Sequence, residues 1–170
     1  MRENKNKNFA YRCIMAVKNQ LDKLLISLDV GEKNALLIIL TKDGTICRRG
    51  NGSGYSSNMP LLKGSSYDGH FEALLMTVSE ETLLYAGVFN QDPKLGKDCQ
   101  LMIIFNGKEE QEINFKCTYG ENSQGPPQEL VQIIINAVKL TDPWYKEEIE
   151  NLKTLDKNSA ETKKWWEVWK

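Results

Sequence analysis

The chain's single histidine, His70, limits the catalytic chemistry that the sequence can support. Metal sites built on two imidazoles, such as those of HExxH zinc proteases or two-histidine iron enzymes, require a second histidine. A catalytic histidine would also need a distant nucleophile such as Cys47, and the sequence holds neither a G-x-S-x-G elbow nor a local cysteine-protease signature. His70 stands where we expect a helix to begin, so a surface histidine in a first turn is the simpler interpretation.

Two arginines precede a glycine-rich stretch that invites comparison with phosphate-binding loops. Arg48 and Arg49 carry guanidinium groups that suit phosphate or carboxylate, and residues 50–54 read Gly-Asn-Gly-Ser-Gly. The glycine spacing matches neither a dinucleotide fingerprint nor a Walker A motif. Because successive strand residues point to opposite faces, the two arginines cannot hold one ligand within a continuous strand. A solvated strand end followed by a flexible surface loop is the competing interpretation.

Polar residues elsewhere offer two weaker candidates. Ser123 and Gln124 lie just before a helix opened by Pro126-Pro127, where an anionic ligand would meet the positive end of a helix dipole. A stiff capping loop explains the same residues. Catalysis by a pair of carboxylates needs a set separation that a sequence does not display, and helix first turns or hairpin loops account for the acidic groups more simply. Those groups are Glu80-Glu81, Glu109-Glu110-Glu112 and Glu147-Glu148-Glu150.

The four cysteines are too widely spaced to form a metal site. Cys13, Cys47, Cys99 and Cys117 include no CxxC pair, so no turn supplies two thiolate ligands. We expect reduced thiols that pack as small apolar side chains. The sequence therefore predicts no metal and no cofactor.

The most unusual feature of the sequence is a cluster of tryptophans, Trp165, Trp166 and Trp169, in the last six residues. Exposed tryptophan leaves a large apolar surface in water, so this tail must dock on the protein's own body, on another copy or a partner, or on a membrane interface. Six lysines and six acidic residues balance in the tail, which weakens the membrane alternative. We predict a helix starting near Asn158 and Glu161 in which Trp165 and Trp169, four residues apart, are substantially buried.

Length and composition fit one domain with ordinary globular chemistry. The chain has 170 residues, 41% of them hydrophobic, and a net charge of -1, which gives no general attraction to nucleic acid. The longest apolar run, residues 35–40, is far shorter than the roughly 20 residues of a membrane-spanning helix. No secretory signal is recognisable at the N-terminus, so we expect a cytoplasmic protein.

Hydrophobic periodicity and turn residues predict the elements that would position these groups. Residues 1–8 are polar and are expected to be disordered. Asp43-Gly44 is a hairpin signal, and Thr77 with Glu80 forms an apparent capping box. The expected elements are a helix over 10–24, strands over 24–30, 35–41 and 45–49, a strand-free mobile loop over 50–69, helices from Phe71 to near Gly87, strands over 100–105 and 111–119, a mostly buried helix between Pro126-Pro127 and Asp142-Pro143, and two further helices divided at 156–158.

The last two strands permit a prediction of register. A two-residue turn at Asn106-Gly107 would set apolar residues opposite charged ones, whereas a loop over residues 106–110 aligns the apolar residues on one face. That longer loop pairs Phe105 with Gln111, Ile103 with Ile113, Leu101 with Phe115 and Cys99 with Cys117.

The predicted fold is an α+β domain over residues 1–142, with a mainly antiparallel sheet and helices on one face, and a helical tail over residues 143–170 that is not an independent domain. The absence of a catalytic motif favours a non-enzymatic protein-binding or regulatory module that acts through the tryptophan tail or residues 50–69. A small hydrolase or transferase using His70 or scattered carboxylates is the alternative. Small-ligand binding at residues 50–69 is a third hypothesis.

Overall fold

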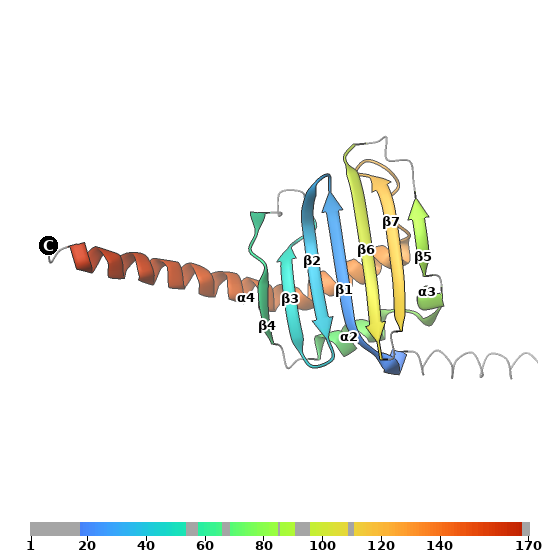
Figure 1. Cartoon of the computed structure of the whole chain (residues 1–170), viewed down its shortest axis with the longest axis horizontal. Helices are drawn as coiled ribbons and strands as arrows, with labels where there is room; N and C mark the ends of the chain where they lie inside the picture. Colours follow the sequence, from blue (N-terminus) through green and yellow to red (C-terminus); the bar gives the residue numbers. More distant parts are fainter. Residues whose placement is uncertain are drawn as a thin grey trace, which may run out of the picture.

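A computed structural model describes residues 18–53, 58–65, 69–84, 86–90, 96–108 and 111–167, with backbone alone at 80, 84 and 156–167. Within these residues the chain forms a seven-stranded sheet in the order β4-β3-β2-β1-β6-β7-β5, together with three helices (Figure 1). The elements are β1 (Leu21–Val30), β2 (Lys33–Thr41), β3 (Thr45–Gly50), β4 (Leu62–Ser65), α2 (His70–Thr77), α3 (Glu80–Leu84), β5 (Gly87–Asn90), β6 (Asp98–Gly107), β7 (Glu112–Gly120) and α4 (Gln128–Glu167).

The predicted α+β class is confirmed. Neighbouring strands of the sheet pair antiparallel, except that β5 pairs parallel with β7 at one edge. β5 was not predicted from the sequence, because a run of four residues is too short to show a clear period. The turn at Asp43-Gly44 forms as predicted, with Gly44 at φ 89° and the Asp43 carboxylate accepting hydrogen bonds from the hydroxyl of Thr41 and the backbone N–H of Thr45.

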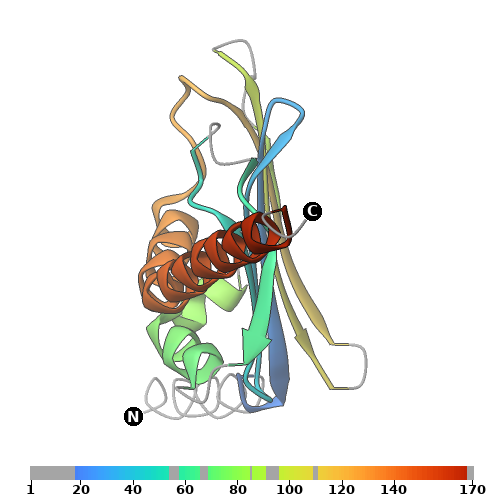
Figure 2. The same cartoon turned by 90° about the vertical axis from the view of Figure 1, so that its left-hand side faces the viewer.

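All described helices cover the same face of the sheet, and none of them lies on the opposite face (Figure 2). Alternate strand residues point toward the helices, which is the two-residue period of a pleated sheet. The core lies between these two layers. It includes Leu24, Ile26, Ile38, Leu40, Ile103, Phe105 and Phe115 from the strands, Phe71 and Leu74 from α2, and Leu130, Ile133 and Ala137 from α4.

The end of the predicted N-terminal helix is a strand instead. The pairing of β1 with β6 shifts register between Leu21 and Lys23, as at a β-bulge. This irregularity places Leu21 and Leu24, three residues apart, in the same buried core, so a strand reproduces a spacing typical of a helix. The rest of that prediction, up to residue 17, and the predicted disorder of residues 1–8 lie outside the described residues.

Two local predictions about the middle of the chain are wrong. Residues 50–69 were expected to contain no strand, but β4 lies within them and pairs with β3, because the neighbouring edge of the sheet needs a partner for its backbone groups.

The capping box also differs from the one predicted. The hydroxyl of Ser79 accepts the backbone N–H of Thr82 and so begins α3, whereas the Thr77 hydroxyl donates to the Leu74 carbonyl inside α2.

α4 is a single helix of 40 residues that passes through Pro143, so the predicted stop at Asp142-Pro143 and the predicted break at 156–158 are both wrong. Proline removes one helical N–H and usually ends or kinks a helix. Here the turns on both sides of Pro143 are attached to the sheet through Arg48 and Tyr145, which compensates for the lost hydrogen bond. The first half of α4 is also less buried than predicted, since Ile135 is 38% exposed.

The β6–β7 register is shifted by two residues from the prediction. Phe105 pairs with Ile113, and Cys99 lies opposite Tyr119 rather than Cys117. β6 extends to Gly107 because that residue still pairs with β1, and this shortens the connecting loop. A shift of two residues preserves the alternation of faces, so Phe115 and Cys117 are buried in the core as expected.

Candidate functional site

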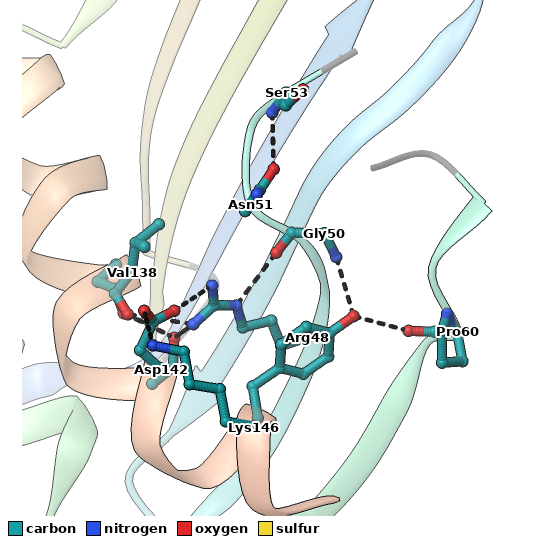
Figure 3. Close-up of polar contacts among 11 residues, drawn as sticks. Arg48, Gly50, Asn51, Ser53, Pro60, Val138, Asp142 and Lys146 are labelled. Carbon is teal, nitrogen blue, oxygen red and sulfur yellow. Dashed lines mark hydrogen bonds and ion pairs between the residues drawn. The ribbon is translucent and has the colours of Figure 1, made fainter. Parts of the chain in front are cut away.

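Arg48 is the most deeply buried charged residue among those described, with 1% of its surface exposed. It lies on β3 and points toward α4 (Figure 3). Its Nη1 donates to the carbonyl of Val138 at 3.1 Å and to the hydroxyl of Thr141 at 2.8 Å. Its Nη2 forms an ion pair with Asp142 at 2.6 Å, and its Nε donates to the carbonyl of Gly50 at 3.2 Å. The predicted solvated strand end is therefore wrong for Arg48.

Tyr145 completes the attachment on the next turn of α4. Its hydroxyl accepts the backbone N–H of Gly50 and donates to the carbonyl of Pro60, both at 3.1 Å (Figure 3). The guanidinium carbon of Arg48 lies 4.8 Å from the centre of the Tyr145 ring, which is a cation–π distance. One tyrosine thus joins α4, the end of β3 and the segment that leads into β4.

The carboxylate of Asp142 is the anionic partner of this network. Partial burial alone would raise the pKa of Asp142, but hydrogen bonds and charge from Arg48 and Lys146 outweigh it and hold the pKa below its ordinary value. Lys146 reaches the second carboxylate oxygen at 3.2 Å from the following turn of the helix. Asp142 therefore stays ionised at neutral pH and balances the buried charge of Arg48.

The Arg48 network has little capacity left for a ligand. Four donor contacts leave at most one N–H of the guanidinium uncommitted, and the acceptors are protein groups on β3 and α4. A buried charge with these partners fixes the position of a helix against a sheet. We therefore assign Arg48, Thr141, Asp142 and Tyr145 to the docking of α4.

Arg49 lies on the other face of the sheet, as the alternation of a continuous strand predicts. It pairs with Leu37 of β2 and is partly exposed, while its Nε is buried and has no hydrogen-bond partner among the described residues. The two neighbouring arginines are thus divided between the two faces of the sheet and cannot bind one ligand together.

The other predicted ligand-binding residues lie on separate elements. α2 begins at His70, which is partly exposed, and lies near the lower end of the sheet in Figure 1. Ser123 and Gln124 belong to the connection from β7 to α4, which leaves the upper end of the sheet in the same view. The hydroxyl of Ser123 accepts the N–H of Gly125, an arrangement typical of a turn. The structure does not bring His70 together with Ser123 and Gln124.

Two adjacent clefts lie where α3 meets the first turns of α4. One is about 280 Å³ and the other about 230 Å³, and they share Ser79, Thr82 and Glu129. Most of the surface of both clefts is apolar, and Val78 and Ile133 contribute to it in the larger one. None of the residues predicted from the sequence to bind a ligand lines either cleft. The further lining residues are Thr77, Glu81, Phe89, Phe115, Pro127, Gln128, Leu130 and Gln132.

The second half of α4 extends beyond the β4 edge of the sheet (Figures 1 and 2). Leu152 is 39% exposed and Leu155 is 64% exposed on this part of the helix. The helical backbone includes Trp165 and Trp166, whose side chains lie outside the described residues, as does all of Trp169. The predicted burial of Trp165 and Trp169 therefore stays a prediction.

The residues that hold α4 against the sheet were not predicted from the sequence to do so. Thr141 and Tyr145 continue the spacing of Ala137 at intervals of four, a signal that was present but was interrupted by the assumed stop at Pro143. Asp142 was treated as part of that stop. Nothing local in the sequence indicates that Arg48, more than 90 residues earlier, is its partner.

The described residues contain no group of three histidine, cysteine, aspartate or glutamate side chains that could hold a metal ion. In the same residues no helix is long and apolar enough to cross a membrane. Comparison with known proteins adds no assignment, since neither a protein-family model nor a curated protein matches this chain.

Proposed function

We propose that this protein is a non-enzymatic binding module that recognises another protein through the projecting half of α4, residues 146–167. The observation that carries the proposal is the exposure of Leu152 and Leu155 on a helix that extends past the edge of the sheet (Figure 1). The proposal retains the cytoplasmic location expected from the sequence.

The physical argument concerns what a projecting helix gains from a partner. The docked half of α4 nucleates the helix, so the projecting half needs only to propagate. Its intrahelical support is modest: an ion pair between Glu150 and Lys153 at 2.7 Å, with most of both side chains exposed, contributes little. Covering the exposed leucines with another apolar surface would stabilise the helix and bind the partner in the same step.

The tryptophans extend the same surface in the sequence. Trp166 follows Leu155 by eleven residues, which is close to three helical turns, so both positions fall on one face of a continuous helix. Aromatic side chains with neighbouring leucines are typical anchors of a helix that lies in an apolar groove. We expect the partner to offer such a groove or a second apolar helix.

Two other hypotheses gain less support. His70 is not among the residues that line the two clefts, so hydrolase or transferase chemistry that uses it gains less support than the projecting helix. Within residues 50–69, β4 pairs with β3 and the carbonyl of Pro60 accepts a hydrogen bond from Tyr145, which gives this segment a role in the fold. The projecting helix is therefore the better candidate for the binding element.

The test compares two double variants of the full chain. Leu152→Glu with Leu155→Glu puts two charges on the proposed face, whereas Asn151→Glu with Thr154→Glu adds the same charges at exposed neighbours. A partner captured by the wild-type chain is identified, purified and titrated against each variant. We expect the leucine variant to weaken binding about tenfold or more and the control to change it about twofold or less. Equal affinities for both variants would overturn the proposal.

A further inference from the structure

The two clefts between α3 and α4 form one surface, which we call the α3 groove. Its two halves share Ser79, Thr82 and Glu129. We propose that residues 9–17 of the same chain bind in the α3 groove. This inference is independent of the binding function proposed for α4.

The first argument is the position of the attachment point. The ammonium group of Lys18 donates to the carbonyl of Val78 at 2.6 Å and to that of Leu75 at 3.3 Å, both at the C-terminal end of α2. A cation in this place binds the last carbonyl groups of the helix, which have no donor within the helix, and is favoured by the negative end of the helix dipole. Val78 also lines the larger cleft. Lys18 is therefore held beside the α3 groove, and a segment that directly precedes it needs no long connection to enter.

The second argument is the apolar pattern of residues 9–17. Ala10, Ile14 and Val17 recur at intervals of four and three, which places them on one face of a helix, and Cys13 lies next to that face. The groove offers matching apolar surface on Val78, Ile133 and neighbouring side chains. At about 280 and 230 Å³ the two clefts have room for a few apolar side chains rather than for a whole helix. Such a surface suits the apolar face of a helix laid across it.

The third argument is charge. The proposed segment, residues 9–17, has one charged residue, Arg12, and the residues on either side of it, 1–8 and 18, add four basic residues and one acidic residue: Arg2, Lys5, Lys7 and Lys18, with Glu3. Among the described residues that line the groove, Glu81 and Glu129 are acidic and none is basic. A basic segment tethered next to an acidic rim is favoured over an acidic or neutral one.

Cross-linking in the full-length protein tests this placement with Cys13 as the natural handle. Cys47→Ser is included throughout to remove the half-buried thiol, and Gln132→Cys introduces a thiol at an exposed position of the groove. The matched control is Lys116→Cys, which is exposed on the opposite face of the sheet. Each protein is treated with a short bis-maleimide, and the linked peptides of the monomer are quantified by mass spectrometry.

We expect Cys13 to link efficiently to position 132 and weakly to position 116. Adding Ile14→Asp should lower the link to position 132 about tenfold, because a carboxylate would have to enter an apolar surface. Glu129→Lys, at an exposed position that leaves the core intact, should also lower it. Equal yields at positions 116 and 132, or no effect of either variant, would overturn the inference. A link found only between two chains would show that the segment binds a second copy, which also contradicts it.

Discussion

The two halves of α4 differ in what lies beneath them. Up to Tyr145 the helix crosses the sheet and buries Leu130, Ile133, Ala137 and Thr141. Beyond the β4 edge, Leu152 and Leu155 are exposed, and no strand of the described residues lies beneath this part of the helix (Figure 1). The helix is continuous, so burial ends at a boundary set by the width of the sheet and not by the helix itself. This difference separates residues that stabilise the domain from residues available to a partner.

The largest difference in the free energy of unfolding should come from two alanine substitutions, one on each side of this boundary. Tyr145→Ala removes a buried ring together with hydrogen bonds to Gly50 and Pro60, and should lower the free energy of unfolding by about 3–4 kcal/mol. Leu155→Ala should change it by less than about 0.5 kcal/mol. Urea denaturation followed by circular dichroism measures both. Similar losses for the two variants would remove the distinction between the halves.

A second prediction concerns the ion pair at the end of the docked half. Asp142→Asn leaves Arg48 buried without its counter-charge and should cost about 1–2 kcal/mol at pH 7, less than in a fully buried pair because Asp142 is 34% exposed. Lys146→Ala, at the exposed end of the same network, should cost less than about 0.5 kcal/mol.

The cost of Asp142→Asn should depend on pH in one direction. Because the pKa of Asp142 is lowered in the folded state, its ionised form stabilises the protein above the ordinary value of 3.8, and this contribution is lost as the pH falls through the lower folded-state pKa. The difference in unfolding free energy between wild type and variant should therefore be constant near neutrality and shrink below about pH 4. A difference that grows toward acid pH would contradict the role given to Asp142.

A smaller effect than that of Asp142→Asn is expected at the edge strand that marks the boundary. A Cβ on Gly64 of β4 would lie 2.9 Å from Cζ2 of Trp144, closer than carbon atoms normally approach. Gly64→Ala should therefore cost about 1 kcal/mol, although alanine otherwise suits a strand better than glycine. In a Trp144→Leu background the same change should become neutral or stabilising. Additive effects of the two substitutions in a double-mutant cycle would show that the ring is not what excludes the side chain.

The fold was largely predictable because alternation and turn chemistry are local signals. Asp43-Gly44 predicted its turn, and the buried residues of β2 and β3 follow the two-residue period. The failures occurred where tertiary contacts override local preference. Leu21 and Leu24 show helical spacing because the strand is irregular, and Pro143 stays within a helix because both of its flanking turns are attached to the sheet.

The candidate sites were less predictable because they depend on which distant residues meet. The sequence showed that Arg48 and Arg49 face opposite ways, but it could not show that Arg48 meets α4 across the core. The α3 groove is built from residues of five segments, each of ordinary composition, so no local motif marks it. The tryptophans were conspicuous in the sequence. Leu152 and Leu155, which precede them on α4, are exposed, and this exposure could be seen only in the structure.

Amide hydrogen exchange along α4 tests the central claim most directly. In dilute purified protein without a partner, we expect amides of residues 133–142 to exchange with the global unfolding of the domain, and amides of residues 149–155 to exchange many times faster through local opening. Addition of a binding partner should slow the second group and leave the first unchanged. Equal protection of both groups in the dilute protein alone would contradict the claim that the projecting half of α4 lacks the packing that stabilises the docked half.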